Sequence, residues 1–170
     1  QYSKFQLGKA EFLQKNLKLK EIIRKNIEIL KGITFKKEIT ITYDDKSDLT
    51  IYADEDMVNS IFLNLLTNSV KFTLRKGEIW ILTSQQDGYA VISVRDNGIG
   101  MDEQILEKIF KLDAKKSTPG TENETGTGLG LLLVKEFIEK HTGTINVTSF
   151  PSKGTTFTFT LPIGFSETSN

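Results

Sequence analysis

The longest helical pattern in the chain, from Asp54 to about Thr73, constrains the fold most. At 100° per residue, with Ile61 set to 0°, its apolar side chains fall within an arc of about 140°; they are Val58, Phe62, Leu65, Leu66 and Phe72. A helix with one apolar face must bury that face against a second layer of structure. Weaker periodicity predicts further helices at about 18–32 and 129–140, with a stop at Gly32, and a short helix at about 102–110.

Between these helices the chain carries about six short β-rich segments. They lie at residues 39–43, 49–53, 78–84, 89–95, 144–149 and 155–161. We expect 39–43 to pair with 49–53 across the turn at 44–48, and 78–84 to pair with 89–95. The pattern predicts a two-layer α/β (α+β) sandwich, in which helices cover one face of a mixed sheet and the other face is partly wet.

Composition removes several classes of function. Lys+Arg 22 balances Asp+Glu 22, which argues against a nucleic-acid binder. The chain of 170 residues has no cysteine and one histidine, which excludes disulfide scaffolds, Cys-ligated zinc and a Ser-His-Asp triad. There is no apolar run near the roughly 18 residues of a membrane span, and no signal-peptide pattern. The remaining chemistry, of Asn, Asp, Lys, Gly and backbone amides, points to phosphate handling.

Three polar residues share one stripe of the long helix. Asn64, Asn68 and Lys71 fall at about 300°, 340° and 280°, at the edge of the apolar arc. Two amide oxygens and an ammonium group so placed could hold a hard divalent cation and a phosphate. Taken alone, they could equally be surface polar residues.

Two glycine-containing segments stand at element boundaries. In residues 96–100, Asp96 could accept a hydrogen bond from an exocyclic amine, although an ordinary Asp-Gly turn would have the same sequence. Residues 126–130 read GTGLG at the start of a helix, where phosphate oxygens are favoured. This is not the dinucleotide fingerprint, since Leu131 occupies the sixth position. Residues 111–127 show no periodicity and are predicted to form a mobile loop.

Five segments in order then carry a resemblance. They are NLLTNSVKFT (64–73), DNGIGM (96–101), KIF (108–110), GTGLGL (126–131) and GTTF (154–157). Together they resemble the N, G1, F, G2 and G3 boxes of the catalytic ATP-binding domain of sensor histidine kinases, within the superfamily of gyrase, Hsp90 and MutL. The resemblance implies a Bergerat-type ATP-binding fold over residues 9–165, a remnant of an upstream dimerisation helix at 1–8 and a disordered tail at 166–170.

The resemblance also implies the ligands, ATP and Mg²⁺, and the residues that hold the phosphates. Asn68 would bind the metal, Asn64 would support the metal or its waters, and Lys71 would reach the phosphates; Asn64 and Lys71 are therefore the expected catalytic residues. The β and γ phosphates would lie against the end of the lid, at Gly126, Thr127, Gly128, Leu129 and Gly130. Residues 111–125 would be the ATP lid, anchored by Phe110.

The base pocket is implied in the same way. Asp96 would bind the adenine amino group, Phe72 would line the pocket, and Gly98 and Gly100 would shape its wall. Thr155 or Thr156 would lie on the strand behind the adenine, with Thr156 the residue assigned to the site.

One position separates kinases from hydrolases in this superfamily. Similar ATP-hydrolysing proteins carry a glutamate base where this chain has Asn64, and an amide cannot accept a proton near neutral pH. We therefore expect phosphoryl transfer to a histidine of a dimerisation domain absent from this chain, with a response regulator downstream. His141 is expected to cap its helix or face solvent.

The expected setting follows from the same resemblance. The parent is expected to be a cytoplasmic homodimer or the cytoplasmic part of a membrane-anchored sensor, with this fragment monomeric and unable to autophosphorylate alone. The alternatives are a catalytically inert ATP-sensing module and a serine kinase of the anti-sigma-factor type.

Overall fold

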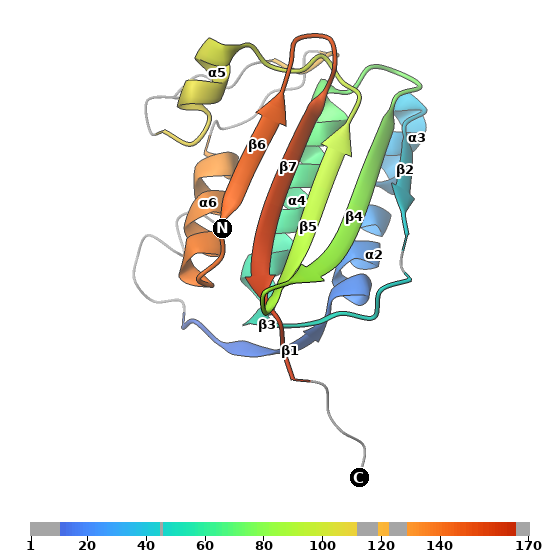
Figure 1. The fold of residues 1–170 in the computed structure, drawn as a ribbon. Coiled ribbons are helices and arrows are strands. Elements are labelled where there is room, and N and C mark those ends of the chain that lie inside the picture. The colour runs from blue at the N-terminus through green and yellow to red at the C-terminus, as the bar shows by residue number, and fades with distance from the viewer. Residues whose placement is uncertain (1–10, 45, 112–118, 123–128, 166–170) are drawn as a thin grey trace.

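The computed structural model describes residues 11–44, 46–111, 119–122 and 129–165, and Figure 1 shows its fold. Five strands form a sheet in the order β2–β4–β5–β7–β6; they are β2 (Thr40–Tyr43), β4 (Glu78–Gln86), β5 (Tyr89–Asp96), β7 (Thr155–Pro162) and β6 (Ile145–Ser149). The β2–β4 pair is parallel and the other pairs are antiparallel, so the sheet is mixed as predicted.

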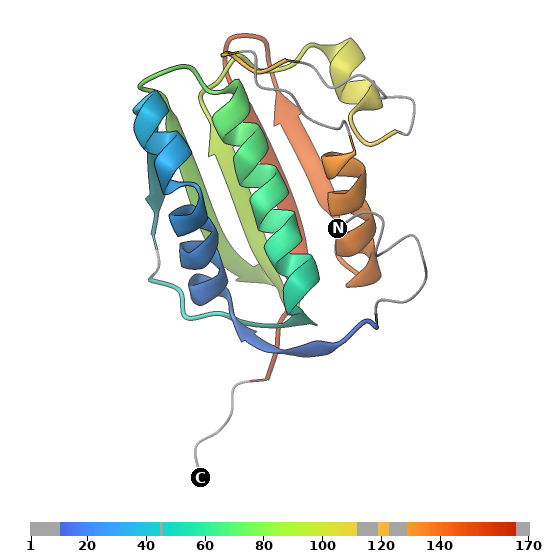
Figure 2. The same cartoon turned by 180° about the vertical axis from the view of Figure 1, so that it is seen from behind.

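The helices α2 (Leu19–Ile29), α4 (Glu55–Phe72) and α6 (Gly130–Lys140) cover one face of this sheet (Figure 2). The short helix α5 (Glu103–Lys108) lies at the end of the sheet where β5 finishes and β7 begins (Figure 1). This arrangement confirms the predicted α/β sandwich. No helix in the described ranges is long and apolar enough to cross a bilayer.

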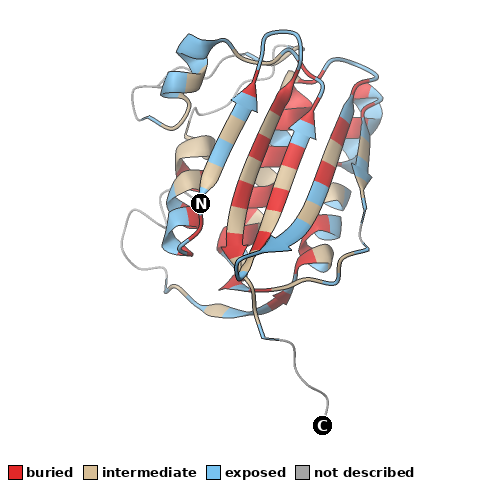
Figure 3. Ribbon diagram, viewed as in Figure 1, coloured by how far each residue is buried: buried red, intermediate tan, exposed pale blue. Residues whose placement is uncertain are grey.

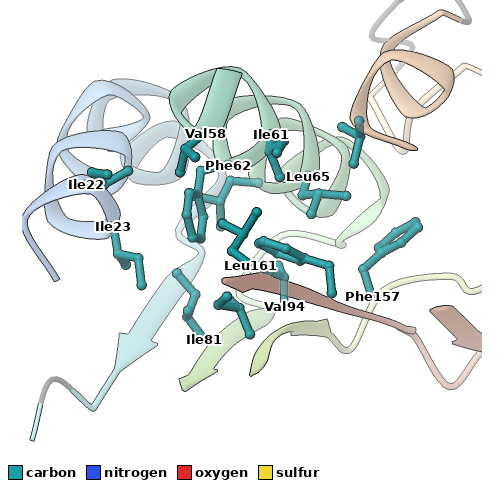
Figure 4. Packing of buried hydrophobic residues seen from close by; sticks show 14 of the residues in the cluster. Ile22, Ile23, Val58, Ile61, Phe62, Leu65, Ile81, Val94, Phe157 and Leu161 are labelled. Atoms are coloured by element: carbon teal, nitrogen blue, oxygen red, sulfur yellow. The ribbon is translucent and has the colours of Figure 1, made fainter. Parts of the chain in front are cut away.

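Burial alternates along the central strands. In β7 the odd-numbered residues are buried and the even-numbered ones are partly exposed, as Figure 3 shows. The buried side chains meet the apolar face of α4 in a continuous core (Figure 4). Phe62 of α4 is fully buried and packs edge-on against Phe159 of β7, with 5.5 Å between ring centroids. One face of the sheet is therefore covered by helices and the other is more exposed to solvent, as expected.

The pairing expected for residues 49–53 is wrong. These residues form β3 (Thr50–Asp54), which pairs antiparallel with β1 (Gln14–Lys18) in a separate two-stranded sheet, while β2 pairs with β4. Alternation shows which side chains of a strand are buried but does not identify the neighbouring strand.

The end of the last strand also lies beside β1 and β3. Ile163 forms a bridge with Ile51, and the Phe165 N–H donates to Asn16 Oδ1 at 3.0 Å. Figure 1 places this contact at the end of the molecule opposite α5.

The expected stop at Gly32 is also wrong, because Gly32 lies inside a second helix, α3 (Lys31–Lys37). That helix ends at Glu38, which takes the left-handed conformation with φ 54°. Thr34 and Lys37 are the buried residues of α3. The helix α3, which was not predicted, therefore contains a buried lysine, Lys37.

Candidate functional site

The middle of α4, which carries Asn64, lies beside the start of α6, and Asn68 and Lys71 follow toward the end of α4 (Figure 2). Asp54 sets where α4 begins, because its carboxylate accepts the Met57 N–H at 3.0 Å. From this start the 3.6-residue period places Asn64 and Asn68 one turn apart on the same face. Sequence spacing and structure agree on this stripe.

Asn64 is held in one orientation. Its Nδ2 donates to the Ser60 carbonyl at 2.7 Å and lies 3.2 Å from the Ser60 hydroxyl. The opposite atom, Oδ1, points toward Gly130, the first residue of α6. A Cβ on Gly130 would lie 2.6 Å from Oδ1, so only glycine leaves room for this amide.

The next residues of the stripe complete a polar surface. Asn68 is half-buried and makes no hydrogen bond to any described residue, so both its amide groups can serve a ligand. Lys71 is 8% exposed, and its ammonium lies 5.1 Å from the centre of the Phe72 ring. An amide, a cation and an aromatic face therefore lie within two turns of one helix.

Asp96 ends β5 and is 4% exposed. Burial raises the pKa of the Asp96 carboxyl group. Three nearby groups oppose this rise: the Gly98 N–H, which donates to Oδ1 at 2.9 Å, the Ser69 hydroxyl and the Thr155 N–H. The loop after Asp96 is fixed to α4, because the Ile99 N–H donates to the Phe72 carbonyl at 3.0 Å. A Cβ on Gly98 would clash with that same carbonyl, which explains the glycine.

Two buried hydroxyls, one in the last turn of α4 and one on its C-cap residue, have no hydrogen-bond partner among the described residues. They are Ser69 Oγ and, one turn later, Thr73 Oγ1. Ser69 is 1% exposed and Thr73 is fully buried. Buried polar atoms are usually paired in folded proteins, so unpaired ones indicate a place for a ligand or solvent.

Some of the remaining predicted residues are described by the structure and others are not. Phe110 packs against the core, Leu129 is half-buried directly before α6, and Gly100 has φ 67° and lies against the Phe150 carbonyl. Thr127 and Gly128, with Gly126, lie outside the described residues, as do residues 1–8 and 166–170.

Thr156 lies on the face of the sheet away from the helices, opposite Arg95. Thr155, which pairs with Asp96, faces the helices instead. Because alternate residues of a strand point to opposite faces, Thr155 replaces Thr156 in the candidate site.

Lys37 is a residue of this region that sequence reasoning missed. Its ammonium donates to the Val70 carbonyl at 2.8 Å and to Thr121 Oγ1 at 2.7 Å. Thr121 belongs to the predicted lid, and its N–H donates to the Lys71 carbonyl at 3.0 Å. Lys36 and Lys37 look alike in the sequence, and nothing in it distinguishes the buried lysine from the exposed one.

His141 is buried, so the solvent-facing alternative is wrong and the helix-cap alternative holds. Nε2 accepts the Asp54 N–H at 3.0 Å, and Nδ1 lies 2.6 Å from the Phe137 carbonyl. Nδ1 therefore carries the proton of a neutral ring. Burial lowers the pKa of His141, although the Phe137 carbonyl acts in the opposite direction.

The donors fit Mg²⁺ only as part of a complex with phosphate. Amide oxygens are hard ligands that suit Mg²⁺, and Asn64 and Asn68 offer two of them. In the described part of the chain, no group of three His, Cys, Asp or Glu side chains could hold a metal ion. Neutral ligands alone would not offset the cost of dehydrating Mg²⁺, so anionic phosphates would have to supply the remaining ligands.

Comparison with known proteins agrees with this geometry. Residues 53–164 match the family "Histidine kinase-, DNA gyrase B-, and HSP90-like ATPase". The adaptive-response sensory kinase SasA of Synechocystis is 35% identical over 153 residues, which are 86% of this chain and 38% of that protein. The chain therefore spans less than half the length of this relative.

Two solved structures have the same fold. The catalytic domain of the histidine kinase ThkA superposes with a TM-score of 0.75 at 28% identity, over 90% of this chain and 98% of that one. Full-length ShkA in complex with AMPPNP gives a TM-score of 0.76 at 26% identity, over 92% of this chain and 32% of that one.

Proposed function

Because this chain belongs to the histidine kinase-, DNA gyrase B- and HSP90-like ATPase family, as an ATP-binding catalytic domain of the histidine kinase type, we propose that it binds Mg-ATP at the end of α4 and donates the γ-phosphoryl group to a histidine of another domain. The observation that carries this proposal is the stripe of Asn64, Asn68 and Lys71 along α4, with Asn64 facing Gly130 at the start of α6. ShkA, a structural relative, was solved with AMPPNP.

Each residue of the stripe has a distinct role in this proposal. Asn68, which has no hydrogen bond of its own to a described residue, offers its amide oxygen to the metal. Asn64, fixed by Ser60, directs Oδ1 toward the same region. Lys71 places a positive charge near the phosphates, and bound Mg²⁺ would supply further neutralisation of their charge.

The adenine would lie against the end of β5, next to the last turn of α4. Asp96 offers a buried carboxylate to the exocyclic amine, and Phe72 offers an aromatic edge to the base. Gly98, Gly100 and Thr155 would form the wall behind it. Residues 111–125 would act as the lid, with Phe110 as its anchor, and residues 126–130 would contact the phosphates through their N–H groups.

Transfer is favoured over hydrolysis by the chemistry of Asn64. A hydrolase needs a base beside the attacking water, and the Asn64 amide has no basic lone pair near neutral pH. Positioning and charge neutralisation are sufficient for transfer to an acceptor that brings its own nucleophile.

The acceptor would come from outside this chain. His141 is the only histidine in the sequence, it is 1% exposed, and both its ring nitrogens face partners within the fold. We therefore propose an acceptor histidine on an upstream dimerisation domain, a homodimeric parent protein on the cytoplasmic side of the membrane, and a response regulator as the next phosphoryl acceptor.

Calorimetric titration with Mg-AMPPNP tests the site. We expect binding in the micromolar range that Asn68→Ala weakens by at least about 10-fold, the size of a lost hydrogen bond or ligand to a charged group. Asn146→Ala, on the exposed edge of β6, is the matched control and should bind like the wild type. Equal affinities for wild type and Asn68→Ala would refute the site.

Mixing the domain with Mg-ATP and a histidine-bearing dimerisation fragment tests the reaction. Phosphohistidine on the fragment is the expected product. Nucleotide binding without transfer would instead support an inert ATP-sensing module.

A further inference from the structure

We propose that Ser69 contributes to adenine recognition by donating its hydroxyl hydrogen to the unprotonated ring nitrogen N1 of adenine, beside the amino group bound by Asp96. This inference rests on the proposed function, because it takes the end of α4 as the nucleotide site. It adds a residue that the sequence did not single out. Its starting observation is the buried Ser69 hydroxyl, which has no hydrogen-bond partner among the described residues.

The position of Ser69 is fixed by the helix and by the loop after β5. Ser69 follows Asn68 directly in α4 and is 1% exposed. The hydrogen bond from the Ile99 N–H to the Phe72 carbonyl ties the loop of Asp96 to the same end of α4. The Ser69 hydroxyl is close enough to act on the Asp96 carboxylate, yet the two make no direct hydrogen bond.

The free hydrogen-bonding capacity of the two groups is complementary. Asp96 Oδ1 accepts the Gly98 N–H, which leaves acceptor positions on the carboxylate. Ser69 brings an O–H donor that makes no hydrogen bond to a described residue, although the Asp96 carboxylate lies near enough to attract it. A carboxylate and a hydroxyl side by side therefore present an acceptor next to a donor.

Adenine carries the matching edge. Its exocyclic N6 amine donates and its adjacent N1 accepts, whereas guanine presents the O6 acceptor beside the N1–H donor. A guanine in the same place would set its O6 against the acceptor-only carboxylate, and the Ser69 hydroxyl would have to accept the guanine N1–H instead of donating. Thr73, the C-cap residue of α4, carries a second buried hydroxyl without a described partner, but Ser69 is the one that acts on Asp96.

Calorimetry on the whole chain with two nucleotides isolates this contact. ATP is compared with 1-deaza-ATP, in which a C–H group replaces N1 and the exocyclic amine is kept. In the wild type, the deaza analogue should bind about 3- to 10-fold more weakly, which corresponds to one neutral hydrogen bond. Ser69→Ala should lower the affinity for ATP by the same factor and leave the affinity for 1-deaza-ATP unchanged. Ser84→Ala, an exposed serine of β4, is the matched control.

Thermal unfolding without nucleotide gives a second readout that a merely structural serine would not produce. Removing a buried hydroxyl that has no partner should stabilise the free domain, and the melting temperature should rise by about 2–4 °C. A serine needed for packing would lower the melting temperature instead.

Two results would overturn the inference. One is an equal loss of affinity for both nucleotides in Ser69→Ala, and the other is no loss for ATP. Failure of the wild type to bind ATP, or full binding by Asp96→Asn, would refute the proposed site itself, so the two failures are distinguishable.

Discussion

Replacing Gly130 with alanine should weaken nucleotide binding while leaving the fold nearly as stable as before. The new Cβ would lie 2.6 Å from Asn64 Oδ1, 3.5 Å from its Cγ and 3.9 Å from its Cβ. Only the tip of one side chain is therefore too close. Reaching an ordinary contact of 3.4 Å requires a shift of about 0.8 Å, and Asn64 cannot simply rotate without losing its hydrogen bonds to Ser60.

The energies of the two effects differ. In the folded domain, alanine gains up to about 1 kcal/mol of helix propensity over glycine, and loosening one Asn64–Ser60 hydrogen bond costs about 0.5–1.5 kcal/mol. The free energy of unfolding should stay within about 1 kcal/mol of the wild type. In the complex, Asn64 would lose a bond to a charged group worth about 1.5–3 kcal/mol, which is a 10- to 150-fold loss of affinity.

A double-mutant cycle shows whether Gly130 acts through Asn64. Mg-AMPPNP affinity is measured by calorimetry for wild type, Gly130→Ala, Asn64→Ala and the double variant, and urea unfolding checks the stability of each. Once the Asn64 amide is gone, Gly130→Ala should have little further effect. Gly32→Ala is the control, since its Cβ would meet nothing within 4 Å. It should add stability and leave affinity unchanged.

An equal loss of affinity from Gly130→Ala in both backgrounds would refute this reasoning. It would mean that alanine disturbs the phosphate contacts of the Gly130 backbone rather than the Asn64 side chain. Unfolding of Gly130→Ala at room temperature would also contradict it, since the clash involves only a side-chain tip.

Three further variants test other parts of the fold by urea denaturation. Because burial holds the pKa of His141 below 6.5, the unfolded chain takes up a proton that the native domain does not. Stability should therefore be full above pH 6.5 and fall as pH drops toward the native pKa, by at most about 1.4 kcal/mol per pH unit, and His141→Gln should lack this slope. Lys37→Met removes a buried ammonium that donates to the end of α4 and should cost about 1–3 kcal/mol, whereas the exposed Lys36→Met should cost less than about 0.5 kcal/mol. Phe62→Ala should cost about 3–5 kcal/mol, whereas Leu82→Ala, which is 56% exposed, should change stability by less than about 0.5 kcal/mol.

Each of these variants has an outcome that contradicts its argument. An unchanged pH slope in His141→Gln would mean that other groups titrate in this range. Equal costs for the two lysines, or for Phe62 and Leu82, would mean that burial does not decide these energies.

The elements with strong local signals could be predicted from the sequence. Periodicity predicted the long helix at 54–73, and the structure has α4 at Glu55–Phe72, because the Asp54 cap fixes its start. The hairpin of β4 and β5 was also predictable, since Asp87 and Gly88 adopt the positive φ angles of a tight turn. The stripe of Asn64, Asn68 and Lys71 followed from helical spacing alone.

The features that were missed depend on contacts between distant segments. Residues 50–54 carry the same alternation whether they pair with β1 or β2, so their partner could not be inferred. The helix α3 was missed because glycine is a common stop, whereas here Glu38 takes the left-handed position. Lys37 gains its importance from its contact with the end of α4, and Ser69 gains its importance from Asp96. In both cases the partner is distant in sequence.

The hydrogen bond between Asn16 and Phe165 joins β1 to the segment that follows β7 at one end of the molecule. The polar stripe of α4 and Asp96 approach the opposite pole (Figures 1 and 2). A segment attached before β1 or after residue 165 would therefore join the domain at the end opposite the candidate nucleotide site. Movement of such a segment could reorient the domain as a rigid body and leave the geometry of the candidate nucleotide site unchanged.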